Sequence, residues 1–238
     1  MRRYALPMFV AALLMSGSAR AAAPACAPPA GLTPAPPLTP AASEVVSGVP
    51  IAHYLLALSW TPQWCRTIGE KGTEQQVECD RPLGFTLHGL WPNGEAPPYP
   101  RYCRPVGGLD ISMVRHMYCR TPSAELLQHE WQAHGACAWP DARAYFAQAA
   151  RLYDKVALPR LEDIGPGRLT AGAIRARFIA RNPAFKREDI FVAATRSDQF
   201  TEVRLCYDLK YQPGACPGGN GAPDGAHLQL APSHTGAF

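Results

Sequence analysis

The sequence predicts an α+β domain, with a mostly antiparallel sheet that is flanked by helices and cross-linked by disulfides. Short segments rich in β-branched and aromatic residues occur early and late in the chain, and helical patterns fill the middle. This order is typical of an α+β fold with helices to one side of the sheet. Eight cysteines, none of them in a Cys-x-x-Cys pair, favour disulfides over a zinc ribbon or a redox motif.

The expected strands are short and are bounded by Gly, Pro or Asp. They cover residues 54–60, 84–90, 190–195, 202–207 and 227–230. The expected helices cover residues 109–118, 123–134, 142–156 and 171–181. Thr121 is the expected N-cap of the second helix, with Pro122 in its first turn, and Thr170 is the expected N-cap of the fourth.

The first 50 residues differ in composition from the rest of the chain. Residues 1–23 combine Arg2 and Arg3 with an apolar run and a small-residue cleavage signature, which is typical of a signal peptide. The run is shorter than the roughly 20 residues that span a bilayer, so a signal peptide and no stable membrane association are expected. A retained N-terminal anchor is the alternative. Residues 24–50 are rich in Pro and Ala and predict an extended tether to a domain over residues 51–238. The protein is therefore expected to be periplasmic or secreted, where disulfides form, and to be a monomer.

Removal of the expected signal peptide changes the net charge. The full chain has 23 Lys and Arg against 19 Asp and Glu, which gives a formal net charge of +4. Without Arg2, Arg3 and Arg20 the basic residues number 20 against the same 19 acids, and the net charge is +1. Bulk charge therefore does not predict nucleic-acid binding, and any site for a polyanion must be local.

The first candidate site residue is His88, at the end of an expected strand. In that strand it points to the face opposite Phe85 and Leu87. Gly89 follows directly and allows a backbone or a ligand to approach closely. From this pattern alone, a structural histidine with Trp91 in the core remains an alternative.

The second candidate group lies at the end of the expected second helix. His129 and His134 are five residues apart, roughly 140° around an α-helix, whereas a two-histidine zinc clamp needs a spacing of four. Glu130 lies four residues before His134 and is expected to orient that imidazole and to favour its protonated form. Gly135 is the expected C-cap. A solvated helix end with an incidental ion pair is the alternative.

Together the two segments supply two imidazoles, a carboxylate and an aromatic ring, which is the inventory that metal-free RNA cleavage requires. A general base takes the proton of the 2′-OH, and a general acid protonates the departing 5′-oxygen. Cations or hydrogen-bond donors stabilise the negative charge on phosphorus. Histidine suits both roles because its pKa lies near working pH. DNA lacks the 2′-OH and is not an expected substrate.

The two segments resemble the active-site signatures of the ribonuclease T2 family of exported endoribonucleases. Residues 54–62, followed by Cys65, are similar to the family's opening strand. The resemblance implies a metal-independent endoribonuclease that needs no cofactor and acts on single-stranded RNA. It implies transphosphorylation through a 2′,3′-cyclic phosphate to 3′-phosphate ends, with low base specificity.

The resemblance also implies a role for each candidate residue. It makes His88 the general acid for the leaving 5′-oxygen and His134 the general base for the 2′-OH. It assigns His129 to phosphate binding and Glu130 to catalysis, as groups that stabilise the pentavalent transition state. It makes Trp91 the ring that stacks on the base 5′ to the scissile bond.

Two positions depart from the family's pattern. Ala133 stands where the family often carries a lysine, so a positive charge near the phosphate is missing. Arg101 and Arg115 are two candidates to replace it, which the sequence does not rank. Asn93, implied to contact the base, stands where many relatives carry aspartate, and this leaves base preference open.

The resemblance further implies a set of cysteine pairs. The expected pairs are Cys65–Cys79, Cys103–Cys137 and Cys206–Cys216. Cys103 is preferred over Cys119 as the partner of Cys137, and Cys26 and Cys119 have no assigned partner.

Two other functions stay open at the level of sequence. One is a metallohydrolase, against which the histidine spacing argues and which a chelator would inactivate. The other is a non-catalytic RNA-binding or host-interaction protein on the same fold, because a fold does not guarantee activity.

Overall fold

The computed structural model describes residues 26–68, 79, 81, 83–159 and 167–232. The expected signal peptide, residues 1–23, lies outside this described part. Within it, no helix combines the length and the apolar character that crossing a membrane requires.

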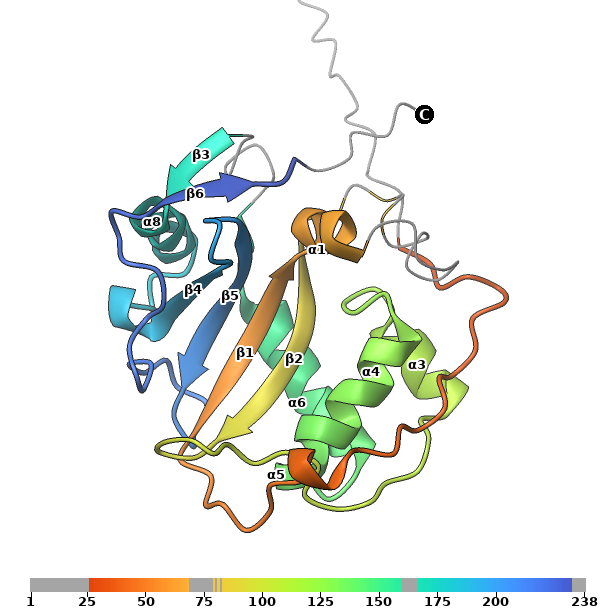
Figure 1. Ribbon diagram of the computed structural model, residues 1–238. Coiled ribbons are helices and arrows are strands. Elements are labelled where there is room, and N and C mark those ends of the chain that lie inside the picture. Colours follow the sequence, from red (N-terminus) through yellow and green to blue (C-terminus); the bar gives the residue numbers. More distant parts are fainter. Residues whose placement is uncertain (1–25, 69–78, 80, 82, 160–166, 233–238) are drawn as a thin grey trace, which may run out of the picture.

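The elements follow the predicted order, with strands at both ends and helices between them (Figure 1). The strands are β1 His53–Trp60, β2 Phe85–Asn93, β3 Gly167–Thr170, β4 Ile190–Ala194, β5 Phe200–Tyr207 and β6 His227–Leu230. The helices are α1 Thr61–Ile68, α3 Ile111–Met117, α4 Ala124–Glu130, α5 Ala136–Ala138, α6 Ala142–Lys155 and α8 Ala171–Arg181. A π-helical turn, Trp131–Gly135, joins α4 to α5, and two 3₁₀ turns cover Ala42–Glu44 and Arg187–Asp189.

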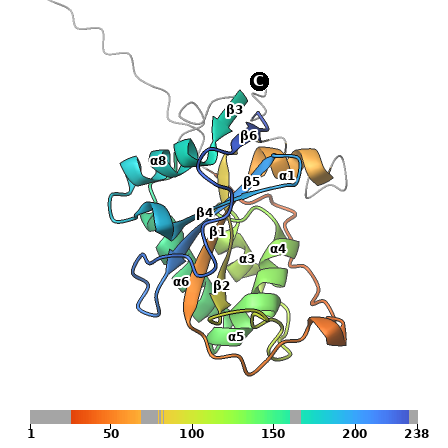
Figure 2. The same cartoon turned by 60° about the vertical axis from the view of Figure 1, so that its left-hand side comes forward.

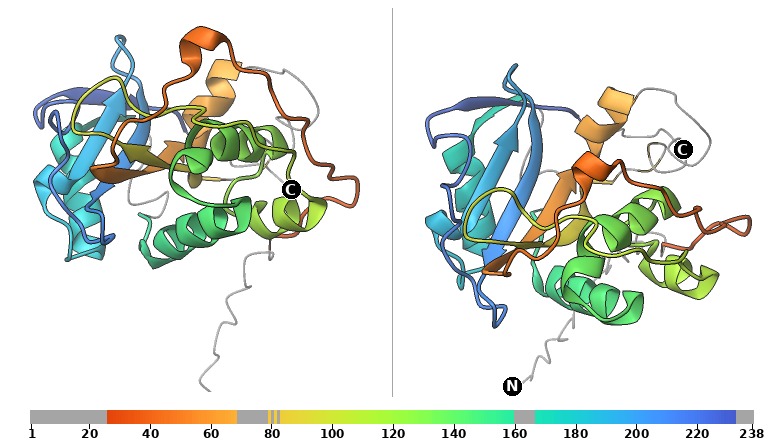
Figure 3. Two further views of the ribbon diagram at one scale, coloured as in Figure 1. Left: turned by 90° about the horizontal axis from the view of Figure 1, so that it is seen from below. Right: turned by 60° about the horizontal axis from the view of Figure 1, so that its bottom comes forward.

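The main sheet has the strand order β2-β1-β5-β4, and all of its neighbouring strands are antiparallel. β3 and β6 form a separate antiparallel pair. Figure 1 shows α6 behind β1 and β2, with α3 and α4 beyond the β2 edge of the sheet. Figure 3 shows the teal α8 at the opposite, β4 side of the molecule. The predicted fold class, an antiparallel sheet flanked by helices, is confirmed.

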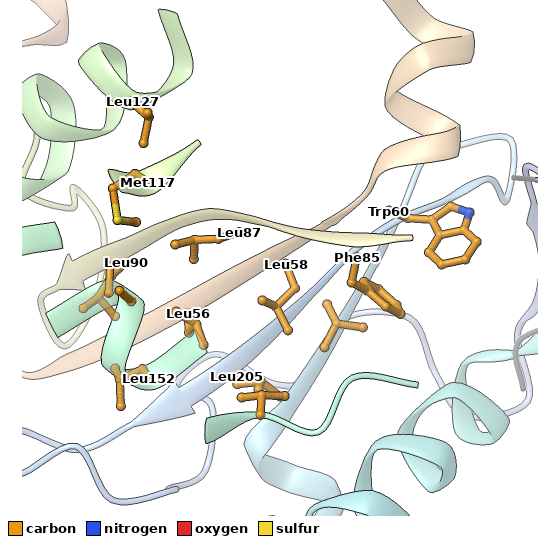
Figure 4. Packing of buried hydrophobic residues seen from close by; sticks show 14 of the residues in the cluster. Leu56, Leu58, Trp60, Phe85, Leu87, Leu90, Met117, Leu127, Leu152 and Leu205 are labelled. Atoms are coloured by element: carbon orange, nitrogen blue, oxygen red, sulfur yellow. The ribbon is translucent and has the colours of Figure 1, made fainter. Parts of the chain in front are cut away.

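One face of the sheet forms the hydrophobic core. Leu56 and Leu58 of β1 alternate toward it and are paired with Leu90 and Leu87 of β2. All four are 2% exposed or less. Figure 4 shows these leucines together with Leu205 of β5 and residues of the helices. Burial of each such side chain stabilises the fold by about 1.5–3 kcal/mol, which fixes which face of the strands points inward.

The segment before β1 is extended, as predicted, but it does not behave as a tether. Cys26 is bonded to Cys119, which holds the start of the segment to the end of α3. The Leu38 backbone exchanges two hydrogen bonds with the Gln132 side chain, each 2.9 Å long. Figures 1 and 2 show the segment passing α3 and α4 before it reaches β1. A Pro-rich composition predicts extended backbone, but these long-range contacts decide that the segment is docked.

Four disulfides connect all eight cysteines. Three of them are the expected pairs, Cys65–Cys79, Cys103–Cys137 and Cys206–Cys216, which are confirmed. The fourth, Cys26–Cys119, joins the two cysteines to which the sequence assigned no partner. Cys103 is thus confirmed as the partner of Cys137.

Several local predictions need correction. Thr121 is not the N-cap of the second helix, because its Oγ1 donates to the Leu87 carbonyl at 2.7 Å. Ser123 caps α4 instead, and its Oγ accepts from Leu126 N. Thr170 is confirmed as the N-cap of α8. The sequence does not predict helix α1 or strand β3, because both are short. Helix α1 directly follows β1, and strand β3 directly precedes α8, in each case without a turn signal between them.

Candidate active site

His88 lies on a β-bulge that turns it toward the face opposite the core. The pairing of β1 with β2 runs Ala57 to Gly89 and then Leu58 to Leu87, so His88 is an extra residue in β2. A bulge of this kind re-aims a side chain and is common beside functional sites. The His88 side chain is 30% exposed, and the core-facing position of Leu87 agrees with the predicted pattern.

His129, Glu130 and His134 meet because the helix changes its winding. In the turn Trp131–Gly135 the Ala136 backbone N–H bonds to the Trp131 carbonyl, which is the i→i+5 pattern of a π-helix. Residues five apart then lie on the same side of the helix. The donor atoms of His129, Glu130 and His134 all lie within 4.8 Å of one another. The predicted separation of 140° is therefore wrong, because it assumed an uninterrupted α-helix.

Packing against α6 explains the glycine in this turn. A Cβ at Gly135 would lie 2.6 Å from Trp131 Cε3 and 2.7 Å from Tyr145 Cγ. Gly135 has a φ of −59°, which is right-handed, so the predicted C-cap role is wrong. The residue must be glycine because Tyr145 and Trp131 approach the backbone too closely for a side chain.

Glu130 is buried between the two histidine-bearing segments. Its Oε2 accepts a 2.7 Å hydrogen bond from Trp91 Nε1, and its Oε1 lies 3.5 Å from His88 Nε2. Within the described part of the chain, Oε1 has no hydrogen-bond partner. Burial raises the pKa of Glu130 to about 7, although the charge of His88 and the Trp91 hydrogen bond oppose this. Glu130 can therefore hold a proton near neutral pH.

The pKa of His134 is displaced in the direction opposite to the one that the sequence predicts. Burial, followed by the charges of His129, Arg101 and His88, holds the pKa of His134 well below its ordinary value. The prediction that Glu130 favours the protonated form of His134 is wrong, because the Glu130 carboxylate is engaged with Trp91 and close to His88. His134 is thus a neutral imidazole at neutral pH.

His88 has a raised pKa. Burial alone would lower it, but the hydrogen bond to Glu202 and the charges of Glu130 and Glu202 outweigh that effect. The pKa of His129 is lowered by burial and by the charges of Arg101 and His88. One site therefore contains a histidine that tends to be protonated and two that tend to be neutral.

Three residues of the site were not singled out in the sequence. Glu202 and Arg204 lie two residues apart on β5, so their side chains share the face of the sheet that carries His88. Tyr102 Oη lies 3.3 Å from His129 Nδ1. Charged residues alternating in a central strand are a signal that the sequence contains, but it does not reveal what they face.

A pocket of about 360 Å³ opens beside Trp91 and His134. Trp91, Asn93, Tyr99, Arg101, His134 and Arg204 are among its lining residues. The Arg204 guanidinium lies over the Trp91 ring, with Cζ 4.8 Å from the ring centre. A second pocket, of about 250 Å³, has His88, His129 and the exposed Trp64 among its lining residues. Five of the six sequence-predicted site residues line one of these two pockets. Glu130 lines neither of them and is buried beside Trp91 and His88.

Residues 51–212 match the model of the ribonuclease T2 family. The chain belongs to the ribonuclease T2 family. The matched range contains every candidate site residue from His88 to Arg204, so the resemblance seen in the sequence is confirmed.

Two bacterial relatives are similar over part of their length. The chain is 32% identical over 179 residues to a probable ribonuclease of Haemophilus influenzae, covering 70% of this chain and 61% of the relative. It is 35% identical over 131 residues to a ribonuclease of Aeromonas hydrophila, covering 55% of this chain and 54% of the relative. The chain therefore spans between half and two thirds of these curated relatives.

Two solved structures share the fold. Trichomaglin, described as an S-like ribonuclease, has a TM-score of 0.63 at 19% identity, over 77% of this chain and 98% of that one. RNase NT, solved in complex with 5′-AMP, has a TM-score of 0.57 at 23% identity, over 77% and 99%. At these identities the likeness shows the fold.

Proposed function

We propose that the protein is an endoribonuclease that cleaves single-stranded RNA without a metal, through a 2′,3′-cyclic phosphate to 3′-phosphate ends. The observation that carries the proposal is the opposite displacement of two histidine pKa values in one site, upward for His88 and downward for His134. Groups whose environments separate their pKa values in this way suit a general acid and a general base. These displacements favour a protonated His88 and a neutral His134, which are the states that the reaction needs.

In the proposed first step, neutral His134 takes the proton of the 2′-OH as the 2′-oxygen bonds to phosphorus. The bond from phosphorus to the 5′-oxygen breaks, and protonated His88 delivers its proton to that oxygen. The product is a 2′,3′-cyclic phosphate and a free 5′-OH. In the second step the roles reverse, and His88 takes a proton from water as the water oxygen bonds to phosphorus. The bond from phosphorus to the 2′-oxygen breaks, and protonated His134 delivers its proton to that oxygen, which leaves a 3′-phosphate.

Three neighbouring groups would stabilise the extra charge on phosphorus. Glu130 carries a proton up to about pH 7 and can donate it to a phosphate oxygen, and His129 lies beside it. Arg101 would supply the positive charge that the family's lysine supplies where this chain has Ala133. Hydrogen-bond donors of this kind are worth about 2.7–4 kcal/mol each in other enzymes.

The choice of Arg101 over Arg115 rests on where the two residues lie. Tyr102 N donates to the Ala133 carbonyl at 3.0 Å, so the segment that carries Arg101 packs directly on the turn that lacks the lysine. The charge of Arg101 also lowers the pKa of both His129 and His134. Arg115 instead donates to the Ala30 carbonyl.

The base 5′ to the scissile bond would occupy the pocket beside Trp91 and Asn93. The Trp91 ring lines this pocket and offers a flat face on which any base can stack. This supports low base specificity. We also propose a monomer that is periplasmic or secreted and has no stable membrane association, in keeping with the four disulfides.

The test is digestion of single-stranded RNA and DNA in excess EDTA, with the product ends identified. We expect RNA to be cleaved, DNA to stay intact, and 2′,3′-cyclic phosphates to precede 3′-phosphates. His88→Ala and His134→Ala should each lose several orders of magnitude in kcat/KM. An RNA-binding protein without activity would give no products at all, and a His88→Ala variant with normal activity would exclude the acid role.

One observation favours a metallohydrolase as the second candidate. The π-helical turn brings two imidazoles and a carboxylate within 4.8 Å, which is the ligand set of many catalytic zinc sites. The same assay separates the two functions. A metallohydrolase would stop in EDTA, recover with zinc, and leave 5′-phosphate ends.

A further inference from the structure

The mechanism above leaves one buried carboxylate of the site without a role. Glu202 lies on β5 with its side chain 8% exposed, and its Oε2 lies 2.6 Å from His88 Nδ1. Its Oε1 accepts a 2.7 Å hydrogen bond from Arg204 Nε. Both carboxylate oxygens are therefore engaged, and one of them binds the ring of the proposed general acid.

We propose that Glu202 is a positioning residue for His88, which it holds with Nε2 free and protonated for the leaving 5′-oxygen. The proposal rests on the proposed function of the site. The effect of Glu202 on the reaction is then confined to protonation of the leaving group.

The hydrogen bond to Glu202 fixes the His88 ring in one orientation. A histidine that donates Nδ1–H to a carboxylate has a fixed ring orientation and a fixed tautomer. In His88 this leaves Nε2 on the side of Glu130, whose Oε1 is 3.5 Å away, and of the pocket that reaches His129. The bulge at His88 alone would direct the side chain but would not stop the ring from rotating.

Charged and titratable groups surround His88 on several sides. Glu202 and Arg204 face it from β5, Glu130 and His129 from α4, and His134 from the π-helical turn. Burial and the charge of Arg204 lower the pKa of His88, whereas Glu202 raises it through a hydrogen bond and a charge. Without Glu202, only Glu130 remains to oppose burial, and Glu130 is charged mainly above about pH 7.

The surroundings of Glu202 favour its ionised form. Burial would raise its pKa, but the bonds and charges of His88 and Arg204 lower it overall. The Arg204 guanidinium is itself fixed over the Trp91 and Phe191 rings. The proton that His88 transfers is therefore the one on Nε2, while Nδ1–H stays on the ring and Glu202 stays ionised.

The test compares two substrates whose leaving groups differ. A dinucleoside phosphate releases a 5′-alkoxide, which needs a proton, whereas a nucleoside 3′-(4-nitrophenyl phosphate) releases an aryl oxide, which does not. General acid catalysis contributes about 10²–10⁴-fold, and loss of its positioning should remove part of this. We expect Glu202→Gln to lower kcat on the dinucleotide by about 10- to 100-fold and to leave the aryl substrate within about threefold.

The pH profile provides a second readout. His88 must be protonated to act as the acid, so activity on the dinucleotide falls as pH rises through its pKa. Removal of the Glu202 charge lowers that pKa, and the basic limb of kcat/KM should move to lower pH. Glu188→Gln, at an exposed position, is the matched control and should change neither rate nor profile.

Equal losses on both substrates, or an unchanged basic limb, would overturn the proposal. If Glu202→Gln does not fold, ¹⁵N NMR of the wild-type protein decides instead. We expect His88 to keep its Nδ1 proton above its pKa, and a proton found on Nε2 there would overturn the proposal. A wild-type protein that cleaves neither substrate would refute the proposed function itself, which is a separate outcome.

Discussion

Replacement of Gly89 by alanine tests the geometry of the site most directly. A Cβ at Gly89 would lie 1.8 Å from Glu130 Oε2, whereas ordinary van der Waals contact begins at 3.4 Å. To restore ordinary contact, the carboxylate at the end of the Glu130 side chain would have to move by about 1.6 Å. Such a move breaks the 2.7 Å hydrogen bond from Trp91 and changes the position of Glu130 relative to His88.

We expect Gly89→Ala to lower kcat/KM on a dinucleoside phosphate by about a hundredfold, since a misplacement of about 1 Å can have that effect. Circular dichroism should show an unchanged fold. The control is Gly107→Ala, where no atom of the described residues lies within 4 Å of the added Cβ. Its activity should stay within about twofold of the wild-type protein.

A second substitution tests whether displacement of the Glu130 carboxylate causes the loss of activity. Glu130→Asp shortens the side chain by one carbon–carbon bond, about 1.5 Å, which is close to the displacement that Gly89→Ala imposes. The double variant should therefore be more active than Gly89→Ala alone. Wild-type activity in Gly89→Ala, or a double variant that is no better than the single one, would refute the reasoning.

Three further predictions concern charge, cross-linking and burial. Arg101→Ala should lower kcat/KM by about 10²-fold. It should also move the acidic limb of the pH profile to higher pH, because the pKa of His134 rises when a nearby positive charge is lost. Arg115→Ala is the control and should do neither. Replacement of Cys26 and Cys119 by serine should lower the free energy of unfolding by about 4 kcal/mol, because the bond closes a loop with a sequence separation of 93. An unchanged urea midpoint would contradict this. Glu130→Gln should lower activity. It should also raise the unfolding midpoint at pH 8 but not at pH 4. The folded-state pKa of Glu130 is raised to about 7, so the wild-type protein loses stability as pH rises through that value and the buried carboxyl ionises, whereas the Gln variant does not. Equal midpoints for the wild-type protein and Glu130→Gln at pH 8 would argue against a buried, ionised carboxylate.

The sequence by itself determined the elements that depend on local pattern. The apolar alternation in β1 and β2 sets which face is buried, because a slip of one residue would expose Leu56 and Leu58. The two histidine segments, the fold class and three of the four cysteine pairs also follow from the sequence, largely through the family resemblance.

Only the tertiary structure decided how the site residues face one another. His129 lies beside His134 because a π-helical turn replaces the α-helix where Tyr145 packs against Gly135. His88 meets Glu202 because only β1 separates β2 from β5 in the sheet and the bulge turns His88 out of the regular pairing. Each of these depends on residues distant in the sequence, and no local periodicity encodes such contacts. The same distant neighbours, through burial and charge, set the opposite pKa shifts of His88 and His134.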